Sequence, residues 1–102
     1  MRFRDVNIRH EARADLFEIY DYLASRRSRD FAFGYIGRIE KVCESLIEFP
    51  HRGVPRTDLG AALRSLNFEG RAVIVYHLVG ETVEIVRILH AGRNVTADLF
   101  DQ

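Results

Sequence analysis

Hydrophobic residues recur with two different periods along this chain, and the change of period marks the predicted elements. Phe3, Val6 and Ile8 predict a short first strand from Phe3 to Ile8. From about Arg9 the spacing becomes i, i+4, i+7, i+8 and i+11, which is one face of an amphipathic helix. The members of this face are Ala12, Leu16, Ile19, Tyr20 and Leu23.

A second helical stripe follows the break at residues 28–30. Asp30 is expected to cap this helix at its N-terminus. The helix is expected to end near Glu48, because the residue before Pro50 avoids the α region. Two helices separated by so short a break are predicted to pack as an antiparallel hairpin. The stripe consists of Ala32, Ile36, Ile39, Cys43 and Leu46.

Three runs rich in β-branched residues follow an irregular loop from Phe49 to Gly60. We expect strands over Ala61–Phe68, Arg71–Leu78 and Thr82–His90, joined by tight turns that contain glycine. The predicted order β-α-α-β-β-β is an α+β fold, with the helical hairpin packed on an antiparallel sheet. The 102 residues are expected to form one domain, 1–102.

Both faces of the last predicted strands are apolar. Strict alternation places Val86, Ile88 and His90 on one face of the last strand, opposite Arg87 and its neighbours Ile85 and Leu89. Two helices can cover only one face of such a sheet. We therefore expect part of the other face to be an apolar surface for another chain.

Composition excludes several classes of function. The formal net charge is zero, so no global basic field draws the chain to nucleic acid. No apolar run approaches the ~20 residues of a membrane span. The single cysteine, Cys43, falls on the helical stripe and is expected in the core, and one cysteine indicates a reducing cytoplasm. The four histidines lack metal-ligand spacing, and no cofactor motif is present, so neither a metal nor a cofactor is expected.

The remaining candidate chemistry is a set of polar residues on the predicted strands. Metal-free RNA cleavage needs proton-transfer groups, for which His90 or Tyr76 would serve, and a cation for the phosphorane charge, such as Arg64 or Arg87. The structural alternative is that both arginines pair with acids or with backbone carbonyls. Both interpretations stay open from these residues alone.

Four segments in this order and spacing resemble the ParE branch of the RelE/ParE toxin superfamily. They are EARADLFEIYDYL, FPHRGVPRTDLGAALRSL, RAVIVYHL and VEIVRILHAGR, and the resemblance covers essentially the whole chain. It implies a toxin of a type II toxin–antitoxin operon, neutralised by a ParD-like antitoxin of the ribbon-helix-helix class. It also implies contact with DNA only through that antitoxin.

The resemblance implies DNA gyrase as the target for a ParE-like toxin, and ribosome-bound mRNA for a RelE-like one. RelE-like nucleases carry several cations near the sheet and a late tyrosine or histidine; here only Arg64 and Arg87 match, with His90 as a substitute for the tyrosine. Gyrase inhibition without catalytic residues is therefore our expectation. A RelE-like endonuclease and a non-toxic co-repressor remain as alternatives. The residues expected to bind the antitoxin or the target are Arg56, Arg64, Arg87, His90 and Arg93.

Overall fold

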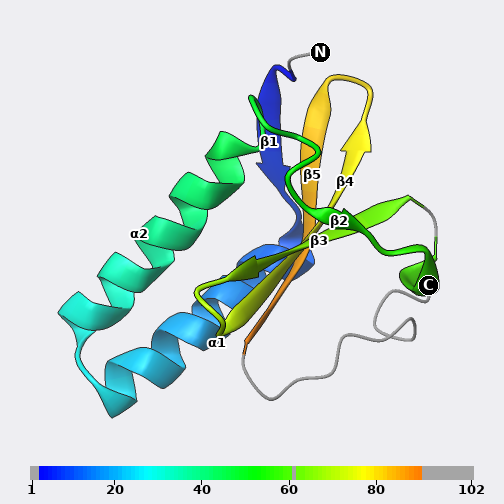
Figure 1. Cartoon of the computed structure of the whole chain (residues 1–102). Coiled ribbons are helices and arrows are strands. Elements are labelled where there is room, and N and C mark those ends of the chain that lie inside the picture. The colour runs from blue at the N-terminus through cyan, green and yellow to red at the C-terminus, as the bar shows by residue number, and fades with distance from the viewer. Residues whose placement is uncertain (1–2, 61, 91–102) are drawn as a thin grey trace.

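The computed structural model describes residues 3–60 and 62–90, and these form two helices packed on one face of a five-stranded sheet (Figure 1). The predicted α+β class is confirmed. The strand order is β1-β5-β4-β3-β2. In chain order the elements are β1 (Asp5–Ile8), α1 (His10–Arg26), α2 (Arg29–Ser45), β2 (Val54–Pro55), the 3-10 helix η1 (Thr57–Leu59), β3 (Leu63–Phe68), β4 (Ala72–Val79) and β5 (Thr82–His90).

The helices begin differently. Arg9 precedes α1 and makes no side-chain cap. Ser28 caps α2, because its hydroxyl accepts a hydrogen bond from the Phe31 amide at 3.0 Å. The prediction that Asp30 caps this helix was therefore wrong. Asp30 lies in the first turn of α2, where the positive end of the helix dipole stabilises its negative charge.

The predicted antiparallel meander is confirmed, since β3 pairs with β4 and β4 with β5 in antiparallel fashion. The sheet as a whole is mixed, because β1 adds to β5 in parallel. The predicted loop from Phe49 to Gly60 also contains structure that the pattern missed. Its two-residue strand β2 pairs with β3, with Val54 opposite Ser65.

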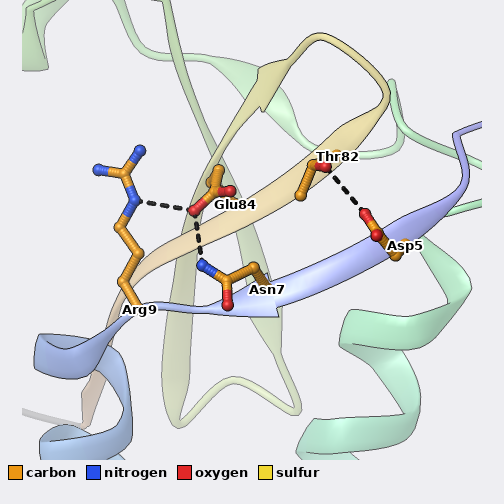
Figure 2. Close-up of polar contacts among 5 residues, drawn as sticks. All are labelled: Asp5, Asn7, Arg9, Thr82 and Glu84. Atoms are coloured by element: carbon orange, nitrogen blue, oxygen red, sulfur yellow. Dashed lines mark hydrogen bonds and ion pairs between the residues drawn. The ribbon is translucent and has the colours of Figure 1, made fainter.

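Polar side chains fix the parallel pairing of β1 with β5 (Figure 2). Glu84 accepts hydrogen bonds from Asn7 at 2.9 Å and from the Arg9 Nε at 3.0 Å. The bond from Asn7, and then the one from Arg9, lowers the pKa of the Glu84 carboxyl. At the other end of the pair, the Thr82 hydroxyl donates to Asp5 at 2.8 Å. These contacts hold the register at an edge strand with only four residues.

A β-bulge in β5 changes which side chains share a face. Val75 lies opposite Arg87 whereas Tyr76 lies opposite Ile85, so Val86 is an extra residue on β5. Ile85 and Ile88 consequently both join the core under the helices, and Val86 packs on the opposite face. The predicted grouping of Ile88 with Val86 was wrong, because one inserted residue reverses the alternation beyond it.

The main core lies between the helices and the sheet, and a second cluster covers the opposite face. There Leu59, delivered by η1, packs with Leu63 and Val75, which are 3%, 8% and 0% exposed. This cluster covers part of the face that was predicted to bind another chain, and Val73 and Val86 beside it are only partly buried. Among the described residues, the two most exposed aromatic side chains lie on the helices, at Phe17 (72%) and Phe33 (75%), and Phe49 in the loop after α2 follows at 61%.

Candidate partner-binding site

Arg87, the charge inside the last strand, is paired with helix α1. Its guanidinium donates to both carboxylate oxygens of Asp15, at 2.8 and 2.9 Å, and the same carboxylate accepts the Ile88 amide at 2.9 Å. The pair is nearly enclosed, with 16% of the Arg87 side chain and 7% of the Asp15 side chain exposed. The hydrogen bond to Asp15 raises the pKa of Arg87. This bidentate pair joins α1 to β5 just past the bulge.

Tyr76 and Arg64 hold the loop that precedes β2. The Tyr76 hydroxyl is fully buried; it donates to the Pro50 carbonyl at 2.7 Å and accepts from the Gly53 amide at 2.9 Å. Arg64 donates through Nε to the Gly53 carbonyl at 3.1 Å and through Nη2 to the His51 carbonyl at 3.4 Å. A Cβ at Gly53 would come within 2.8 Å of the Ser65 carbonyl and the Tyr76 ring. Only glycine therefore fits where the loop crosses the tyrosine.

Arg56 is also engaged within the chain. Its guanidinium makes two hydrogen bonds to Asp58, at 2.9 and 2.8 Å, and a third to the Ser65 hydroxyl at 3.3 Å. The bond to Asp58 raises the pKa of Arg56, and the same contact lowers that of Asp58. The pair stiffens the turn at η1, and it leaves Arg56 already neutralised by an acid two residues away.

His90, at the end of β5, lies among aromatic rings. Its imidazole meets Tyr22 of α1 and Tyr35 of α2 edge to face, with centroids 5.8 and 5.9 Å apart. Burial lowers the pKa of His90, and the nearby positive charge of Arg71 lowers it further. A neutral imidazole is therefore favoured here, held by packing beside two phenol rings.

A cleft opens between α1 and β5 next to His90. Its volume is about 310 Å³, and apolar side chains of Ile19, Ile88 and Leu89 line it, with the half-exposed Tyr22 beside them. Asp15 and Glu18 supply its polar rim. A groove of this kind accepts the apolar face of a short helix better than it accepts a nucleic acid, since the exposed carboxylate of Glu18 at its rim repels phosphates.

The predicted site residues among the described ones thus engage four different sets of partners, the first being Asp58 and Ser65 for Arg56. Arg64 and Tyr76 meet at Gly53, Arg87 is bound to Asp15, and His90 packs against tyrosines. Arg93 lies outside the described residues. The geometry agrees with the structural alternative for both Arg64 and Arg87, because their guanidiniums bind a carboxylate or backbone carbonyls.

No group of three or more histidine, cysteine, aspartate or glutamate side chains in residues 3–60 and 62–90 is arranged to hold a metal ion. Cys43 lies in the core as predicted, 1% exposed, and burial raises the pKa of its thiol to about 12. Within the same ranges, neither helix is long and apolar enough to cross a bilayer.

Comparison with known proteins decides the family. Residues 6–95 match the family model described as "ParE toxin of type II toxin-antitoxin system, parDE". The chain belongs to the ParE toxin family. Two ParE toxins of Caulobacter vibrioides are relatives: Toxin ParE1 is 33% identical over 86% of this chain and 90% of its own length. Toxin ParE3 is 34% identical over 83% of this chain and 84% of its own length.

Solved structures agree with this ParE fold. The chromosomal ParDE toxin–antitoxin system from P. aeruginosa superposes with a TM-score of 0.76 at 21% identity, covering 86% of this chain and 96% of that one. The toxin–antitoxin complex RelBE2 from Mycobacterium tuberculosis gives 0.65 at 19% identity, covering 88% and 99%. At these identities the likeness establishes the fold alone.

Residue-type reasoning missed several positions of this ParE-family toxin that its structure makes important. Asp15 looked like an ordinary early-helix acid, although it fixes the arginine of β5. The position of Gly53 between two prolines indicated a constrained loop. Its contact with Tyr76 could not be predicted, because the two residues are far apart in the sequence. Phe17 and Phe33 lie off the apolar stripes of their helices, and this off-stripe placement was a signal for exposure.

Proposed function

We propose that this ParE-family toxin binds and inhibits DNA gyrase and is neutralised by a ParD-like antitoxin of the ribbon-helix-helix class. The family match over residues 6–95 is the observation that carries the proposal. The toxin acts in the cytoplasm, where gyrase and the antitoxin are. It meets operator DNA only as part of the complex with its antitoxin.

The contacts of the candidate nuclease residues favour gyrase over mRNA as the target. A general acid or base must reach the reacting oxygen, yet Tyr76 is fully buried and its hydroxyl already makes two hydrogen bonds. Arg87 would have to leave Asp15 to bind a phosphorane, and Arg64 would have to release the loop carbonyls. A toxin that acts by binding a protein needs none of these rearrangements.

The cleft between α1 and β5 is the proposed binding site for a helical segment of the antitoxin. Its apolar lining, Ile19, Tyr22, Ile88 and Leu89, would take up the apolar face of that segment. The contact would rest mainly on apolar burial, because Arg56 and Arg87 already have acidic partners in the toxin itself. An adjoining extended segment would add to a free sheet edge, either β1 or β2.

Expression of the toxin without an antitoxin separates the candidate functions. We expect induction of the SOS response and loss of supercoiling by purified gyrase, with translation continuing at first. His90→Gln provides a sharper comparison, with His10→Gln as the exposed control on the same chain. Gyrase inhibition should survive both substitutions, since neither residue is asked to transfer a proton.

Cleavage of ribosome-bound mRNA that is lost in His90→Gln and kept in His10→Gln would establish the endonuclease instead. Expression without any growth defect would favour the co-repressor. Either result would contradict the gyrase proposal.

A further inference from the structure

The outer surface of the helical hairpin carries a groove that the proposed function does not use. The groove has a volume of about 370 Å³, and Leu16 and Ile36 form its floor. Two strongly exposed rings border it, Phe17 at 72% and Phe33 at 75%. We call this groove and its border the hairpin face. It lies on the other flank of α1 from the antitoxin cleft. The residues that border it are Arg13, Phe17, Tyr20, Phe33, Gly37 and Glu40.

Gly37 lies in the middle of α2, and the packing of the described residues does not explain why a glycine is there. Glycine is the weakest helix former after proline, because the unfolded chain loses most freedom there. A Cβ at Gly37 would meet nothing within 4 Å, so no packing among residues 3–60 and 62–90 requires its absence. The missing side chain leaves a shallow gap beside the exposed phenylalanines, as needed where a second surface approaches the helix closely.

The two helices place complementary groups at similar heights along the groove, within one or two residues of each other. They are antiparallel and joined at Arg27 and Ser28, so positions equally distant from this junction lie level with each other. Counting from it, Phe17 lies level with Arg38, the residue next to Gly37. By the same count Arg13 lies near the level of Glu40, and Tyr20 near that of Phe33. One end of the face therefore carries a cation on α1 and an anion on α2.

We infer that the hairpin face binds a second copy of this chain. A two-fold axis parallel to the helices lays α1 of each copy, antiparallel, over α2 of the other and preserves every height along the groove. Arg13 then faces Glu40 of the second copy, and the reciprocal pair forms as well. Phe17 lies over the gap at Gly37 of the second copy.

The charges single out this occupant. A face with one cation and one anion at similar heights, on opposite helices, complements itself when rotated about that axis. A partner helix bearing one sign of charge would leave either Arg13 or Glu40 opposed by a like charge. Tyr20 would meet Phe33 of the second copy, so the aromatic pairs close the other end.

Charge reversal tests the arrangement by sedimentation equilibrium of the purified full-length chain. Arg13→Glu and Glu40→Arg should each raise the dimer dissociation constant on the order of tenfold or more, because like charges then face each other twice. An equimolar mixture of the two variants should associate as tightly as the parent, since each reversed residue faces an opposite charge. Failure of the mixture to recover, or a parent chain that stays monomeric at every concentration, would overturn the inference.

Gly37→Ala supplies a second test that an unfolded variant cannot imitate. The alanine should raise the melting temperature of the dilute monomer and weaken the dimer, because its methyl group fills the gap beneath Phe17. Gly34→Ala is the matched control: it lies on the same helix but outside the groove, and should raise the melting temperature without weakening association. Should the groove substitutions alter antitoxin affinity in a chain that is always monomeric, the face belongs to the antitoxin, and the inference fails while the gyrase proposal stands.

Discussion

The arginines on and beside the sheet were predicted to bind partners and the outer face of the helical hairpin was not, yet the surroundings of the two regions are the reverse of that expectation. Arg56, Arg64 and Arg87 bind acids or carbonyls of their own chain at hydrogen-bond distance. Phe17 and Phe33 keep about three quarters of their surface in solvent. The difference shows that an internal contact can fully occupy even a side chain that is well suited to recognition.

The same comparison assigns the two regions different tasks. Side chains that are already paired stabilise the toxin, and their removal should be measured as lost folding free energy. Side chains that are exposed without internal contacts contribute little to folding. Removing them should therefore weaken binding to a second molecule and leave the folding free energy of the monomer nearly unchanged.

The Asp15–Arg87 pair should give the largest effect. Asp15→Ala leaves a mostly enclosed guanidinium and the Ile88 amide without their acceptor, and should lower the free energy of unfolding by about 3 kcal/mol. Urea denaturation measures this, with the exposed Glu18→Ala on the same helix as a control expected within about 0.5 kcal/mol. Additive costs for Asp15→Ala and Arg87→Ala in the double variant would show that the two residues do not act as a pair.

Tyr76 should give an intermediate effect. Tyr76→Phe keeps the ring but leaves the Gly53 amide and the Pro50 carbonyl without their buried partner, at a cost of about 2 kcal/mol. Faster amide exchange confined to residues 50–53 would locate the change. Tyr20→Phe, on the partly exposed hairpin, is the control and should leave stability within about 0.5 kcal/mol. Equal losses of unfolding free energy in Tyr76→Phe and Tyr20→Phe would contradict the role of the Tyr76 hydroxyl in holding the loop.

Phe33 should give the smallest effect, although Phe33→Ala removes a whole aromatic ring. Because 75% of this residue is exposed, Phe33→Ala should change the unfolding free energy of the dilute monomer by less than about 0.5 kcal/mol. Phe68→Ala, at 4% exposure in the core, should cost about 3 kcal/mol or more. A large loss for Phe33→Ala would mean that the hairpin face serves the monomer, and the contrast between the two regions would disappear.

Periodicity predicted the elements that depend on a continuous apolar stripe. The span of α1, the αα-hairpin and the meander of β3, β4 and β5 all follow from such stripes, and the structure contains each of them. Membership of the family was also readable, because four segments in a fixed order carry it along the chain. These signals are local and repeat every few residues.

The features that periodicity missed depend on contacts across the chain or on one-residue choices. Nothing near Val86 marks a bulge, since its neighbours are all compatible with a regular strand. Ser28 and Asp30 are both good capping residues, and only the actual first turn decides between them. The hydrogen bonds of Arg64 and Arg87 could be predicted only by knowing which residues lie beside them in the fold. These are Gly53 and His51 for Arg64, and Asp15 for Arg87.

The parallel pairing of β1 has a consequence for the timing of synthesis. This strand has one neighbour in the sheet, β5, and Asp5 meets Thr82 from 77 residues further along. A ribosome adds about 5 to 20 residues each second, so roughly 4 to 15 s separate the translation of the two strands. The nascent chain cannot complete its sheet during that interval. The toxin fold is thus completed only once β5 has been translated, which gives an antitoxin already in the cell time to meet the chain.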